Sequence, residues 1–86
     1  MEYMYTEIVE AVQVRFLNGE WNTNEWKELA AYYGYSSRVV DDFVKFVGDS
    51  NSFRAHDSEY IVFNKTIGGY SISESDFMKK FKKVEK

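Results

Sequence analysis

The chain has 86 residues, of which 44% are hydrophobic and 29% are charged, a balance typical of one globular domain rather than of a disordered chain. It contains no cysteine, which excludes a disulfide framework and a zinc site built from thiolates. The net charge is −3 but uneven, because residues 1–60 carry five bases against eleven acids and residues 61–86 carry six bases against three acids. We therefore expect a single domain over residues 1–86, without the large basic face of a general nucleic-acid-binding protein.

The first twenty residues carry four glutamates and a single base, Arg15. This composition is unlike a secretory signal peptide, which needs a basic region followed by an apolar stretch. No apolar run approaches the roughly 20 residues that span a bilayer. We expect a cytoplasmic protein with no membrane partner.

The first element expected along the chain is a strand over residues 7–17. Its apolar residues alternate, and the β-branched content favours a strand although a helical period fits almost as well. On this interpretation one face carries Ile8, Val12, Val14 and Phe16, and the other carries Val9, Ala11 and Leu17.

The clearest helix is expected from Asn22 to Gly34. Asn22 with Glu25 three residues later has the spacing of a capping box, and Gly34 suits the left-handed position that ends a helix. One helical face gathers the apolar residues Trp26, Leu29, Ala30 and Tyr33.

Residues 43–72 consist of short apolar runs separated by turn residues, a spacing that predicts an antiparallel meander. The expected strands are 43–47, 52–55, 60–63 and 70–72, with a hairpin turn at Gly68 and Gly69. A terminal helix should follow, because Ser73 and Asp76 form a cap signature. Its apolar stripe would be Phe77, Phe81 and Val84, and its solvated side would carry Lys79, Lys80, Lys82, Lys83 and Lys86.

Residues 36–47 allow a second interpretation, a helix-turn-helix motif. Seven residues from Leu29 onward have the apolar, small and glycine character that its template requires, and the later strands would form a wing. However, its recognition helix would present Asp41 and Asp42 with only Arg38 and Lys45 as bases, which opposes the binding of DNA. The two folds that remain are an α+β fold and a winged helix-turn-helix.

The segment Ile8-Val9-Glu10-Ala11-Val12-Gln13 resembles the V-V-E-A-I-Q opening of small uncharacterised proteins of tailed bacteriophages. In those proteins a helix follows, and the chain ends in a pattern like G-D-Y-I-I … G-E-F-Y-x-x-x-x-x-x-F-x-x-x-Y. Here Ser58-Glu59-Tyr60-Ile61-Val62, Gly69-Tyr70-Ser71-Ile72, Phe77 and Phe81 occupy the corresponding places. Ser58 and Phe81 depart from the pattern, and the middle of the chain is unmatched. The resemblance implies a phage origin and a strand–helix–meander–helix order, and it implies no particular activity.

That order favours the α+β fold: a small antiparallel sheet, with curling into a partial barrel left open, one helix after the first strand and one C-terminal helix. Residues 39–47 are then at least partly a strand, and we expect residues 41–47 to be extended and to pair with residues 52–55.

The sequence contains no group of residues typical of catalysis or metal binding. His56, Asp57 and Glu59 form the one cluster that could touch a metal, but alternate strand residues share a face, so His56 would point away from the two acids. The segment from Asp49 begins like a calcium loop but lacks its required glycine and glutamate. There is no nucleophile elbow and no glycine-rich phosphate loop. We expect no enzyme, no metal and no cofactor.

The aromatic residues between Trp21 and Tyr35 exceed what one helix face can bury. Exposed aromatics beside an arginine suit a protein-binding hot spot or stacking on a nucleobase, unless the C-terminal helix covers them. Changing such residues should weaken binding without unfolding the domain. The candidate binding residues are Trp21, Tyr32, Tyr35 and Arg38, and then Arg54, His56 and Lys65 on the exposed face of the meander.

These observations favour a non-enzymatic binding protein of phage type. Its expected role is host takeover or counter-defence in the host cytosol, as an inhibitor that masks a host protein or sequesters a nucleotide ligand. Nucleic acid is not an expected partner, and homo-oligomerisation is left open. The alternatives are a winged-helix DNA-binding transcriptional regulator and a structural part of the virion.

Overall fold

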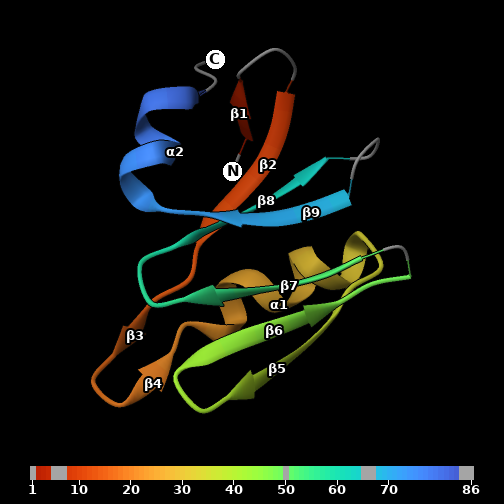
Figure 1. Ribbon diagram of the computed structural model, residues 1–86, viewed down its shortest axis with the longest axis vertical. Helices are drawn as coiled ribbons and strands as arrows, with labels where there is room; N and C mark the ends of the chain where they lie inside the picture. The colour runs from red at the N-terminus through yellow and green to blue at the C-terminus, as the bar shows by residue number, and fades with distance from the viewer. Residues whose placement is uncertain (1, 5–7, 50, 65–67, 84–86) are drawn as a thin grey trace.

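The computed structural model describes residues 2–4, 8–49, 51–64 and 68–83 (Figure 1). Within them the chain forms an α+β fold, as expected. Three separate antiparallel sheets and two helices make up the fold, and no closed barrel forms among these residues. The elements in chain order are β1 (Glu2–Met4), β2 (Ile8–Gln13), β3 (Phe16–Leu17), β4 (Glu20–Trp21), α1 (Thr23–Tyr32), β5 (Ser36–Val40), β6 (Phe43–Val47), β7 (Ser52–His56), β8 (Tyr60–Asn64), β9 (Gly68–Ile72), α2 (Glu74–Lys80) and β10 (Lys82–Lys83).

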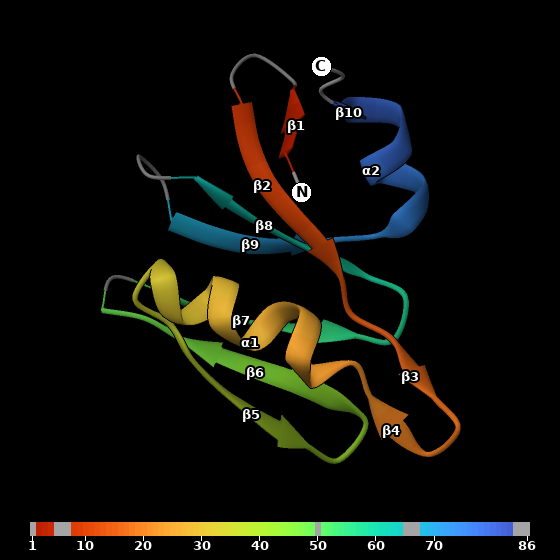
Figure 2. The same cartoon turned by 180° about the vertical axis from the view of Figure 1, so that it is seen from behind.

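The three-stranded sheet has the order β5-β6-β7, and α1 lies against one of its faces (Figures 1 and 2). Val44 and Phe46 of β6 are buried beneath the helix, whereas Lys45 and Val47 alternate with them and are exposed. This period of two is possible only in a strand. The expected pairing with residues 52–55 is confirmed for residues 43–47, where the register sets Phe46 opposite Phe53. It is wrong for Asp41 and Asp42, which were also expected to be extended but form a turn.

The helix-turn-helix interpretation of residues 36–47 is therefore wrong. Residues 36–40 form the edge strand β5, and a two-residue turn at Asp41 and Asp42 sets Val40 opposite Phe43. A tight turn needs residues that tolerate positive φ, and Asp41 has a φ of 50°.

The five-stranded sheet has the order β10-β1-β2-β8-β9, so its centre joins the start of the chain to residues 60–64. Every residue of β8 is buried. Ile61 and Phe63 face a larger core with Trp26 and Phe46, while Val62 faces a smaller core with Phe77 beneath α2. The strand β8 thus separates the two cores.

The first expected strand is shorter than residues 7–17. It ends at Gln13, after which Val14 is buried in the larger core while Phe16 is 44% exposed. The expected alternation therefore fails at its C-terminal end, because Asn18 and Gly19 adopt positive φ and turn the chain into the hairpin β3–β4.

The helix α1 lies where the sequence predicts, but Asn22 does not form the expected capping box. Its Oδ1 accepts hydrogen bonds from the backbone nitrogen of Arg15 and from Nε1 of Trp26, each at 2.8 Å, and its Nδ2 donates to Glu25 Oε1 at 3.1 Å. Asn22 thus ties the helix to the preceding hairpin. Gly34 ends the helix region with a φ of +86°, as expected.

The C-terminal helix begins as predicted, with Ser73 Oγ accepting from the backbone nitrogen of Asp76 at 3.3 Å. It ends at Lys80, earlier than the apolar stripe predicts. Lys82 and Lys83 instead pair with β1, and Val84 lies outside the described residues. A longer helix would place Lys79 and Lys83 four residues apart, which is unfavourable.

The hairpin expected around Gly68 and Gly69 is present as β8–β9, although these two glycines begin β9 and do not form the turn itself. Among the described residues, neither helix is long and apolar enough to cross a membrane.

Candidate functional site

The face of the three-stranded sheet that points away from α1, here called the outer face, is open to solvent. Residues that lie directly opposite one another in an antiparallel ladder share a face of the sheet. The register therefore places three rows across the strands on the outer face: Ser36, Val47 and Ser52; Arg38, Lys45 and Arg54; and Val40, Phe43 and His56.

The central row consists entirely of bases. Arg38, Lys45 and Arg54 are all exposed, and among the described residues the only ion pair within 4.0 Å joins His56 to Glu59. Within the described part of the chain, no carboxylate therefore neutralises the row. Like charges directly opposite each other on neighbouring strands destabilise a sheet. A bound anion would remove that repulsion.

An aromatic ring lies beside this row. Phe43 is half-buried, and the guanidinium carbon of Arg54 lies 5.4 Å from the centroid of its ring. The ring of His56, on β7, has its centroid 5.4 Å from the centroid of the Phe43 ring, and the two ring planes are inclined at 49°. The guanidinium thus makes a cation–π contact with the Phe43 ring, and this pair of planar groups, Phe43 and Arg54, is here called the platform, because another aromatic group can stack on such groups.

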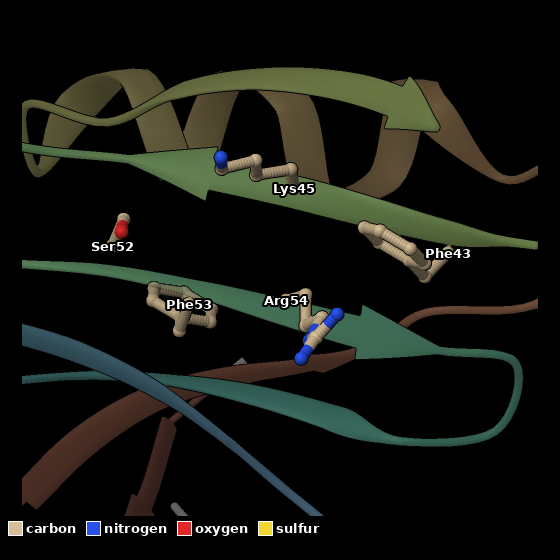
Figure 3. Close-up of a pocket in the computed structure, with 5 residues that line it drawn as sticks. All are labelled: Phe43, Lys45, Ser52, Phe53 and Arg54. Atoms are coloured by element: carbon tan, nitrogen blue, oxygen red, sulfur yellow. The ribbon is translucent and has the colours of Figure 1, made fainter. Parts of the chain in front are cut away.

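A shallow cavity of about 340 Å³ lies over β6 and β7 (Figure 3). Figure 3 shows the ammonium of Lys45 and the hydroxyl of Ser52 toward one end and the Phe43 ring with the Arg54 guanidinium toward the other. The ring of Phe53, stacked on Phe46 at 5.0 Å, also lines the cavity. The cavity thus combines cationic groups, a hydroxyl and aromatic surface.

Acidic residues lie at the turn end of the same sheet. A second cavity of about 220 Å³ is lined by Phe16, Trp21, Asp41, Asp42 and Asp57. Asp57 also has a structural role, because its Oδ1 accepts a hydrogen bond from the backbone nitrogen of Phe16 at 2.8 Å. Among the described residues no three His, Asp or Glu side chains gather to hold a metal ion.

The structure brings together three of the residues that the sequence predicts for a binding surface. Arg38, Arg54 and His56 all lie on the outer face. Trp21 lines the second cavity, and Lys65 lies outside the described residues. Tyr32 is 71% exposed, as expected, but it projects from α1, the helix that covers the opposite face of the sheet.

The predicted exposure of Tyr35 is wrong, because its side chain is only 6% exposed. Its hydroxyl donates a hydrogen bond to Asn51 Oδ1 and accepts one from the backbone nitrogen of Gly69 at 2.7 Å. A Cβ on Gly48 would lie 2.6 Å from its ring. The absence of a side chain at Gly48 therefore makes room for Tyr35, which links the three-stranded sheet to the five-stranded sheet.

Two residues of the outer face, Phe43 and Lys45, are missing from the sequence-based candidates. The signal that would have found them is the alternation along residues 43–47. The position of Lys45 opposite both Arg38 and Arg54 emerges only from the pairing of β6 with its two neighbours.

The outer face can therefore hold an anion and an aromatic group on a rigid, packed support. No protein-family model, no curated protein and no solved structure significantly matches the chain, so the function is inferred from this geometry.

Proposed function

We propose that the protein is a non-catalytic binding protein whose outer face holds an anionic partner. The observation that carries the proposal is the row of Arg38, Lys45 and Arg54, which crosses three strands without a carboxylate partner among the described residues. Arginine pairs bidentately with phosphate or carboxylate, and lysine adds a compact charge. The row therefore matches a phosphate group or an acidic protein segment.

The wider role that we propose is host takeover or counter-defence in the cytosol of an infected cell. It is supported by the resemblance of residues 8–13 and 58–81 to tailed-phage proteins and by the small size of the chain. A protein of this kind would act stoichiometrically as an inhibitor, either by sequestering a nucleotide or by masking an acidic surface of a host protein. A helix-turn-helix regulator is no longer a candidate, because residues 36–47 form a hairpin.

Titration of the ¹⁵N-labelled protein with sodium triphosphate tests the proposal. We expect chemical-shift changes centred on the outer face, and an affinity that falls as salt is added because the contacts are exposed. A variant with Arg38, Lys45 and Arg54 all changed to Gln should bind at least about tenfold more weakly, because hydrogen bonds to charged groups contribute about 1.5–3 kcal/mol each.

The matched control changes Lys27, Lys79 and Lys80 to Gln. It removes the same charge from exposed positions on α1 and α2, and it should bind like the unchanged protein. Equal weakening in both variants would mean that triphosphate responds to overall charge alone and would contradict a specific outer-face site. Recovery of the ligand unchanged after long incubation would agree with the absence of catalysis.

A further inference from the structure

We infer that the anion held by the outer face is a free nucleotide carrying a polyphosphate, with its base against Phe43 and Arg54 and its phosphates along the basic row. This inference rests on the proposed function and names the ligand class for the same site. It combines the cationic row, the aromatic platform and the limited length of the surface.

The platform supplies a place for the base. Planar nucleobases stack on aromatic rings and on guanidinium planes whatever their sequence. The Arg54 guanidinium already lies over the Phe43 ring, at 5.4 Å from its centroid, so the platform exists before the ligand arrives. Phe43 is half-buried, and its own strand, β6, is anchored by Val44 and Phe46, which are buried in the core.

The basic row supplies a place for the phosphates. Neighbouring strands lie about 4.8 Å apart, so the Cα atoms of Arg38 and Arg54 lie about 10 Å from each other with Lys45 between them. Long side chains on such a row can converge on one polyphosphate group. Figure 3 places the ammonium of Lys45 beyond the platform, toward Ser52.

The surface is too short for a nucleic-acid strand. Asp41, Asp42 and Asp57 lie at one end of the sheet and Asp49 follows β6 at the other, so a continuing phosphate backbone would meet carboxylates. Proteins that bind single strands place successive bases on several aromatic residues along the strand, whereas here the aromatic side chains of the three rows, Phe43 and His56, lie together in one row. The cavity of about 340 Å³ lies within the range of about 300–1,000 Å³ found for small-molecule sites.

Calorimetric titrations with ATP, UTP and inorganic triphosphate test this inference on the full chain. We expect each nucleotide to bind about tenfold more tightly than triphosphate, because stacking of one base contributes a factor of this order. The variants Phe43→Leu and Arg54→Lys should lose most of this preference and still bind triphosphate. Phe16→Leu, at an exposed phenylalanine outside the outer face, should keep it. Thermal melting of each variant confirms that it is folded, and the charge-conserving Arg54→Lys tests the platform even if Phe43→Leu is unstable.

The outcomes separate the inference from the proposed function. Equal affinity for nucleotides and triphosphate would overturn the nucleotide assignment and leave an anion-binding face intact. Failure of all three ligands to bind would overturn both. A uridine oligonucleotide whose affinity rises steadily from one to ten residues would identify a strand as the ligand and would also overturn the inference.

Discussion

The hydroxyl of Tyr35 accepts a hydrogen bond from the backbone nitrogen of Gly69 at 2.7 Å, and so joins the residue before β5 to the start of β9. The same hydroxyl donates to Asn51 Oδ1, and Asn51 Nδ2 donates to the carbonyl oxygen of Gly69 at 2.9 Å. Three segments far apart in sequence thus meet at one buried polar group. Because β7 and β9 lie in contact but belong to separate sheets, this link helps fix the outer face relative to the rest of the fold.

Tyr35→Phe should destabilise the protein by about 1–3 kcal/mol, because it removes the hydroxyl and leaves the Gly69 nitrogen without that partner. Urea unfolding monitored by tryptophan fluorescence measures the change. Tyr32→Phe removes the same atom from a side chain that is 71% exposed, and it should change the free energy of unfolding by less than about 0.5 kcal/mol. Equal effects of the two changes would contradict a stabilising role for the Tyr35 hydroxyl.

Gly48→Ala should destabilise the protein by about 1–3 kcal/mol, because its Cβ would lie 2.6 Å from the Tyr35 ring. The reference is Gly19→Ala, whose Cβ would meet nothing within 4 Å and whose cost of about 1 kcal/mol arises from its φ of +80° alone. In a Tyr35→Ala background the effect of Gly48→Ala should largely disappear. A double-mutant cycle measured by thermal or urea unfolding checks this coupling, and additive effects would contradict it.

Local patterns in the sequence predict much of the fold. The Gly48–Asn51 turn between two β-prone runs predicts the pairing of β6 with β7, and the stripe containing Trp26 and Ala30 predicts the buried face of α1. The Asn18-Gly19 pair is an equally strong hairpin signal, and it explains why the strand predicted over residues 7–17 does not continue to its end.

The burial of Tyr35 was beyond local patterns. Helical periodicity leaves Tyr35 outside the core stripe, and its true environment comes from Gly48, Asn51 and Gly69, which lie 13 to 34 residues later in the chain. The basic row of the outer face was beyond local patterns for the same reason. The sequence indicates Arg38 and Arg54 as separate candidates, but their alignment through Lys45 depends on the register of two ladders.

Asp41→Gly should stabilise the protein by about 0.5–1 kcal/mol. Asp41 adopts a φ of 50° in the two-residue turn between β5 and β6, a conformation that glycine reaches without the steric cost of a Cβ. Asp42→Gly removes the same charge at a position with ordinary φ, so it provides the control and should not stabilise. Chemical unfolding measures the free energy of unfolding of both variants. Relief of backbone strain would stabilise only Asp41→Gly, whereas relief of charge repulsion would stabilise both variants equally.

Lys45→Gln should have opposite effects on stability and on binding. Lys45 lies between Arg38 and Arg54, so removing its charge relieves two unfavourable cross-strand pairs and should stabilise the free protein by about 0.2–1 kcal/mol at low salt. The gain should shrink as sodium chloride screens the charges. The same change should weaken triphosphate binding, because the central cation is lost.

Lys27→Gln, on the exposed side of α1, should produce neither effect. Melting temperatures at low and high salt, measured beside the triphosphate titration, check both expectations on one set of samples. A Lys45→Gln protein that is no more stable than the unchanged protein at low salt would show that the row is not under electrostatic strain, and the main reason for assigning it to an anion would be lost.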